Sequence, residues 1–102
     1  PDLKIPDEQV TLGKYGRMRK AYLQEHRRML FNSLLLTGEL TAHLVEIDRT
    51  ANERVSRMVS EMAAAQGVNE ALKERDPMAW VGAMNSLKAQ AEEIVLTELV
   101  YA

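Results

Sequence analysis

The sequence of 102 residues contains no cysteine, three prolines, five glycines and few aromatic residues: one Trp, three Tyr and one Phe. Without cysteine there is no disulfide framework and no thiolate metal site, which is typical of a reducing compartment, so we expect a cytoplasmic protein. Apolar runs such as residues 34–36 and 94–96 are far too short to cross a membrane. No signal-peptide pattern opens the chain, and because it starts at Pro1 we expect further residues before it.

The scarcity of aromatic residues leaves an aliphatic core, in which Leu, Val, Ala and six Met predominate. This mixture favours packed helices, because sheets prefer β-branched and aromatic side chains. The length suits one domain, and a charged fraction of 27% is ordinary for a folded chain. We therefore expect an N-terminal extended arm over residues 1–13, which holds Pro1, Pro6 and Gly13, and a single helical domain over residues 14–102.

Hydrophobic periodicity predicts three long helices. The first runs over residues 14–36 and ends before Gly38. The second runs from Leu40 or Thr41, with Thr41 as a candidate N-cap, to Gln66 before Gly67. Its apolar stripe is Leu44, Ile47, Ala51, Val55, Met58, Met62 and Ala65.

The remaining elements are marked by their caps. A short helix is predicted over residues 69–75 with Asn69 as its cap, and Asp76-Pro77 is typical of the start of another helix, which continues to about Val100. The fold class is thus all-α: three long antiparallel helices and one short connecting helix in an elongated bundle. The second helix would be about 39 Å long, too long for a compact domain of this size, so we expect a homo-oligomer.

Charge is distributed unevenly along the chain. Residues 1–38 carry seven Lys/Arg against four Asp/Glu, whereas residues 39–102 carry six against eleven. A row of cations along a helix suits a phosphate backbone, because binding releases counterions. The candidate nucleic-acid-binding residues on one side of the first helix are Lys14, Arg17, Lys20, Arg27 and Arg28. The alternative is a solvated face whose cations pair with the acidic second half of the chain.

Polar residues also interrupt the apolar sides of the predicted helices. Because a buried charge must be paired, we expect a structural cluster across helices that sets their register, with Arg19 paired to Glu98. The candidate members of this buried polar cluster are Arg19, His26, Glu92 and Glu98. We expect His26 to hydrogen-bond across the bundle.

Other motifs are weaker. His26 and His43 are the only histidines, and a metal site needs three or more converging ligands, so no metal site is expected. The segment 44–58 superficially resembles a helix-turn-helix, but residues 48–52 hold no turn residue, which favours one continuous helix. Gly13 and Gly16 match a KH-type loop that would need a sheet beside it, so they are more simply read as loosening the junction between arm and helix. The aromatic residues Tyr15, Tyr22 and Trp80 are expected in the core.

Several stretches resemble the transposon-encoded TnpV family, in order and spacing over nearly the whole chain. They are residues 13–19, 22–27, 43–48, 80–85 and 91–99. The resemblance implies an origin on a mobile element, and it implies no reaction, cofactor or catalytic residue. With no activated nucleophile or phosphate-cradling loop in the sequence, we expect no enzyme.

Two functions remain open. The first is a non-catalytic accessory protein of a mobile element that binds DNA through the basic side of the first helix. The second is a helical adaptor that binds an element-encoded partner protein such as a recombinase.

Overall fold

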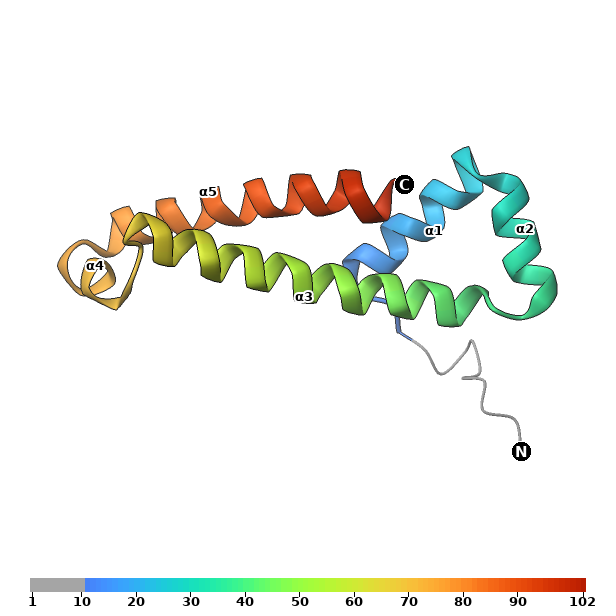
Figure 1. Ribbon diagram of the computed structural model, residues 1–102, viewed down its shortest axis with the longest axis horizontal. Coiled ribbons are helices and arrows are strands. Elements are labelled where there is room, and N and C mark those ends of the chain that lie inside the picture. Colours follow the sequence, from blue (N-terminus) through green and yellow to red (C-terminus); the bar gives the residue numbers. More distant parts are fainter. Residues whose placement is uncertain (1–10) are drawn as a thin grey trace, which may run out of the picture.

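The computed structural model describes residues 11–102, all of them helical or in short connections, with no strand in this range (Figure 1). The helices are α1 (Lys14–His26), α2 (Arg28–Thr37), α3 (Leu40–Gln66), α4 (Glu70–Arg75) and α5 (Pro77–Val95), followed by a π-helical turn, η2 (Leu96–Val100). The all-α class is confirmed. Residues 1–10 of the predicted arm lie outside the described part of the chain, and residues 11–13 precede the first helix.

The long helix α3 is the central element, against which α1, α2, α5 and η2 pack. Helix α5 returns antiparallel beside it, α4 closes the turn between them, and α1 packs on α3 and η2 at the opposite end (Figure 1). The molecule measures 54 × 31 × 18 Å, and its radius of gyration is 17.4 Å. A compact domain of this length has a radius of gyration of about 12–13 Å, so the predicted elongation is confirmed.

Local signals placed most helix ends correctly. Gly38 and Gly67 adopt the left-handed conformation, at φ 75° and 71°, and end α2 and α3. The side chain of Asn69 accepts a hydrogen bond from the Leu72 backbone N–H at 3.0 Å, and Asp76 accepts one from Ala79 at 3.1 Å. Helix α3 begins at Leu40, so Thr41 lies inside it and is not its cap. Helix α3 is unbroken across residues 44–58, which confirms that no helix-turn-helix lies there.

The prediction of one first helix over residues 14–36 is wrong. The helix is interrupted at Arg27, whose φ and ψ are −134° and 53°, and α2 continues in another direction (Figure 1). The bend brings Leu30, Phe31 and Leu34 of α2 against a buried cluster formed by Leu23, Leu40 and Leu44. Arg27 is not a helix breaker, so tertiary packing overrides local propensity here.

The core consists of two clusters. The larger one joins α1, α3, α5 and η2 through Tyr15, Ile47, Ala51, Val55, Ala91, Val95 and Val100, with Met58 and Met62 partly buried against it. The smaller one lies where α1, α2 and α3 meet. The predicted stripe of α3 is confirmed except at its end, where Ala63 is buried and Ala65 is exposed. Tyr15 is in the core as predicted, whereas Tyr22 and Trp80 are half-buried.

None of the helices between residues 11 and 102 is both long and apolar enough to span a membrane.

Candidate functional site

The most buried charge in the described chain is Arg19, which is 6% exposed. Its Nε donates to His43 Nε2 at 3.2 Å, and its Nη1 donates to the carbonyl oxygens of Val100 at 3.0 Å and Ala102 at 2.8 Å. Arg19 therefore ties α1 to α3 and to the end of η2. Main-chain oxygen atoms, and not the side-chain carboxylate of Glu98, compensate its charge, which is how a buried guanidinium is tolerated here.

The environment of Arg19 affects two titrating groups. Burial, and then the charge of Arg27, lowers the pKa of Arg19, which stays protonated because guanidinium ionises far above neutral pH. Burial and the neighbouring charge of Arg19 lower the pKa of His43. Since His43 Nε2 accepts a hydrogen bond, the imidazole is neutral with its proton on Nδ1.

The predicted polar cluster of Arg19, His26, Glu92 and Glu98 is not assembled as expected. Glu98 pairs with Arg54 of α3 on the surface, so the predicted Arg19–Glu98 pair is wrong. His26 is exposed and packs against the Tyr22 ring, with centroids 5.3 Å apart, so it does not bond across the bundle. The sequence pointed to His43 only as a metal ligand, although its place four residues before Ile47 of the apolar stripe was a usable signal for a position near the core.

Glu92 of α5 has its own partners on α1. It accepts hydrogen bonds from Lys14 Nζ at 2.8 Å and from the Tyr15 hydroxyl at 2.7 Å. The hydrogen bond from Lys14 lowers the pKa of Glu92, and that from Tyr15 adds to the effect. Burial, reinforced by Glu92, raises the pKa of Tyr15 to about 12.

Two glycines let α1 approach α3 closely. The Gly16 backbone N–H donates to Asp48 Oδ1 at 2.9 Å. A Cβ on Gly16 would lie 3.2 Å from the Leu44 carbonyl oxygen and 3.3 Å from Asp48 Cβ, and one on Gly13 would lie 2.7 Å from Asp48 Oδ2. Gly16 therefore serves close packing against the α3 backbone, which corrects the expectation that it loosens the start of the helix.

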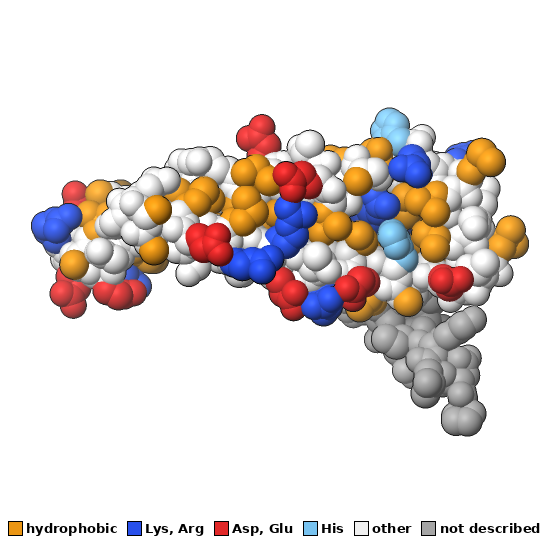
Figure 2. All heavy atoms as spheres, viewed as in Figure 1, with side chains coloured by type: hydrophobic (Ala, Val, Ile, Leu, Met, Phe, Trp, Pro, Cys, Tyr) orange, Lys and Arg blue, Asp and Glu red, His pale blue; other side chains and the backbone are white. Residues whose placement is uncertain are grey.

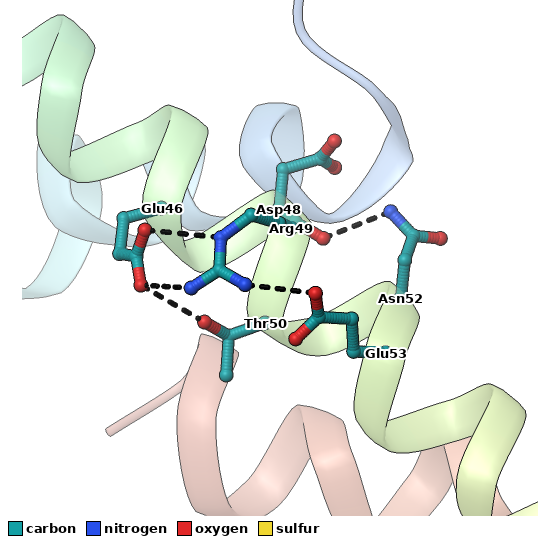
Figure 3. A network of polar contacts seen from close by, with 6 residues as sticks. All are labelled: Glu46, Asp48, Arg49, Thr50, Asn52 and Glu53. Carbon is teal, nitrogen blue, oxygen red and sulfur yellow. Dashed lines mark hydrogen bonds and ion pairs between the residues drawn. The ribbon is translucent and has the colours of Figure 1, made fainter.

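The exposed face of α3 carries a self-contained charge network (Figure 3). The Arg49 guanidinium donates to Glu46 on one side, at 3.2 Å from Nε, and to Glu53 on the other, at 2.8 Å from Nη1. The hydrogen bond from Arg49 lowers the pKa of Glu46. On the face drawn in Figure 2, acidic and basic side chains are interspersed over the left and the middle of the molecule.

The five candidate nucleic-acid-binding residues fall into two groups. Lys14 is paired with Glu92, and Arg27 Nη1 donates to the Ala102 carbonyl at 3.3 Å, so both reach the C-terminal part of the chain. The other three, which we call the basic row, are Arg17, Lys20 and Arg28.

The basic row lines two adjoining hollows. Arg17, Lys20 and Gln24 line one of about 570 Å³, and Gln24 and Arg28 line another of about 210 Å³. Lys20 and Arg28 are exposed and have no hydrogen-bond or ion-pair partner within residues 11–102, while Arg17 Nη1 donates to the Leu12 carbonyl. The basic row thus keeps cations available to an external ligand.

The family model described as transposon-encoded protein TnpV matches residues 1–100. The chain belongs to the TnpV family. No curated protein and no solved structure gives a significant match.

The stretches that carry the TnpV resemblance meet in the fold. Three of these stretches, residues 13–19, 43–48 and 91–99, are joined by hydrogen bonds. Arg19 bonds to His43, Gly16 to Asp48, and both Lys14 and Tyr15 to Glu92. These contacts join α1 to α3 and α5. In this TnpV chain the segments therefore share a structural task, the docking of α1. Within residues 11–102, no three His, Asp or Glu side chains converge as a metal site would require.

Proposed function

We propose that this TnpV protein is a non-catalytic accessory protein of a transposon that binds DNA through the basic row. The proposal rests on which cationic side chains already have partners. Lys14 and Arg27 bond to other residues of the chain, whereas Lys20 and Arg28 have no partner among the described residues. Arg17, Lys20 and Arg28 lie beside hollows that Gln24 joins, so a phosphate backbone can contact all three.

Membership of a transposon-encoded family supports DNA as the polyanion. Three phosphate contacts give a slope of log affinity against log salt of about −3. Because α3 is continuous where a helix-turn-helix would lie, at residues 44–58, we expect binding without sequence preference. Arg19 is excluded from this surface, because its guanidinium is buried against carbonyl groups.

The test is fluorescence anisotropy of a labelled duplex over a range of salt concentrations. The variant Arg17→Gln/Lys20→Gln/Arg28→Gln removes the basic row, and Arg57→Gln/Arg75→Gln/Lys88→Gln removes equal charge from exposed positions elsewhere. We expect the first to abolish the salt-dependent binding and the second to retain a slope near −3. Equal losses in both variants, or a slope near zero in the wild type, would contradict the proposal.

A second candidate, the adaptor for an element-encoded recombinase, is favoured by a different surface. Met78 and Val81 lie three residues apart on α5 and are 82% and 45% exposed, and a pair with this spacing shares one side of a helix. Co-purification of the recombinase after nuclease treatment, and its loss in Met78→Ser/Val81→Ser, would support the adaptor. Retention by that variant would rule out this surface.

A further inference from the structure

Helix α2 carries apolar side chains on two sides. Leu30, Phe31 and Leu34 pack inward, while Met29 and Leu36 are 88% and 87% exposed. Met29 and Leu36 are seven residues apart and therefore point the same way, outward. Every residue of α2 is at least partly exposed. The outer side of α2 is mixed, because Asn32 and Ser33 flank Met29 and Leu36. Among residues 11–102, no element covers these two large apolar side chains, and exposed apolar side chains that lie together mark a contact surface.

A groove of about 690 Å³ lies at the other end of the molecule, between α3 and α5. Its apolar lining includes Val55, Val59 and Ala63 of α3 and Trp80 and Met84 of α5. Helix α1 covers the α3–α5 pair only on the side of η2, and among the described residues no third long helix covers this end. The groove thus lies where a third long helix would pack against α3 and α5 in a helical bundle.

The groove and α2 match in size and chemistry. On α3 the lining runs from Val55 to Ala64, about 14 Å, and α2 is about 15 Å long. Ser60 and Ala64 are small, exposed residues that line the groove, so a helix can approach its wall closely. Arg28 is the one charged residue of α2, which leaves little charge to desolvate on docking.

Helix α2 cannot fill the groove of its own chain, because the two lie at opposite ends of a molecule 54 Å long (Figure 1). A second copy aligned antiparallel can, and by symmetry it also presents its groove to the α2 of the first. A stable interface buries roughly 1,200–2,000 Å² in total, and two reciprocal contacts bury twice the area of one.

We propose that this protein forms a two-fold symmetric dimer in which the α2 helix of each copy docks in the α3–α5 groove of the other. Met29 and Leu36 enter the groove, and Val59, Trp80 and Met84 receive them. The two-fold axis pairs the two contacts with each other, so the assembly closes at two chains, whereas the same helix–groove contact without that axis would propagate from copy to copy. The dimer does not depend on DNA binding.

The test is molar mass in solution, measured by light scattering without DNA. Met29→Lys/Leu36→Lys disables the donor helix and Ser60→Lys/Ala64→Lys disables the groove, and all four positions are exposed, so the fold is retained. Met78→Lys is the matched control, an exposed methionine outside both surfaces. We expect the wild type and Met78→Lys at twice 11.5 kDa, and each double variant at 11.5 kDa.

Mixing the two double variants distinguishes reciprocal docking from other contacts. In the mixture, the groove variant contributes an intact α2 and the helix variant contributes an intact groove, so each pair keeps one of its two contacts. We therefore expect a heterodimer with a dissociation constant at least about tenfold above that of the wild type. A groove variant that stays dimeric would instead indicate contact between two α2 helices. That outcome, a monomeric wild type, a larger assembly, or no heterodimer on mixing would overturn the proposal.

Discussion

Arg19 of α1 and His43 of α3 share a hydrogen bond in which the arginine Nε donates to the histidine Nε2 across 3.2 Å. The bond requires a neutral imidazole, because a protonated one has no acceptor nitrogen. A permanently charged residue and a titrating one thus lie together at the junction of α1, α3 and η2, and the stability of that junction depends on pH.

We expect His43 to make the protein less stable in mild acid. The ordinary pKa of histidine is 6.5, and the pKa of His43 in the folded protein is lower. Below pH 6.5 the unfolded chain takes up a proton that the folded chain refuses, so the free energy of unfolding decreases until the pH passes the folded pKa. Urea unfolding at a series of pH values should show the free energy of unfolding decreasing below pH 6.5 in the wild type. The decrease should be smaller in His43→Gln. His26→Gln, at an exposed histidine, is the control, and an unchanged slope in His43→Gln would refute the assignment.

Removing the Arg19 side chain should destabilise the fold. Arg19→Met leaves the carbonyl groups of Val100 and Ala102 without their donor, which costs about 1–3 kcal/mol of unfolding free energy. Arg28→Met removes an exposed cation that has no partner within residues 11–102 and should change stability by less than about 0.5 kcal/mol. Chemical denaturation of both variants makes the comparison, and equal effects would show that Arg19 is not a structural residue.

The Tyr15 hydroxyl should lose its proton only at unusually high pH. Burial and the contact with Glu92 raise its pKa to about 12, against 10.0 for an ordinary tyrosine. Glu92→Gln removes the carboxylate but not the burial, so the pKa should fall while staying above 10.0. Ultraviolet titration of phenolate in a Tyr22→Phe/Tyr101→Phe background isolates this group. Glu93→Gln, on the adjacent exposed residue, should leave the Tyr15 pKa unchanged.

Alanine should have opposite effects at two helical glycines. Gly82 is exposed in α5, and no atom of the described residues lies within 4 Å of a Cβ built there, so Gly82→Ala should stabilise the helix by about 0.5–1 kcal/mol. Gly16→Ala instead forces a methyl group against the Leu44 carbonyl and Asp48, and should cost about 1–3 kcal/mol. Thermal melting of both variants tests the pair. A stabilising Gly16→Ala would show that α1 is free to move away from α3.

Features that depend on a few neighbouring residues were predictable from the sequence. The left-handed ends at Gly38 and Gly67 and the caps at Asn69 and Asp76 rest on local backbone conformation and short-range hydrogen bonds. The unbroken α3 follows from a periodic apolar stripe with no turn residue inside it. The Arg49–Glu53 pair has the same origin, because residues four apart on a helix are neighbours.

Partners across helices were not predictable in the same way. The sequence showed that Arg19 would need compensation, but carbonyl groups carry no signature in the side-chain pattern, and Glu98 lies nearer to Arg54. His26 was placed in the apolar side of a straight helix. Its helix does continue to His26, but this last residue of α1 is exposed and contacts Tyr22 of its own helix, so helical spacing alone did not show where the packing of α1 ends.

The amino-acid sequence alone determined that this TnpV chain is helical, where most of its helices stop and which side of α3 is buried, because those properties arise from backbone preference and spacing over a few turns. Tertiary structure alone decided that Lys14 and Arg27 are engaged while Lys20 and Arg28 are not, that Gly16 is a contact point, and that α2 stands uncovered. These depend on the angles between helices, which are set by how distant apolar surfaces pack together.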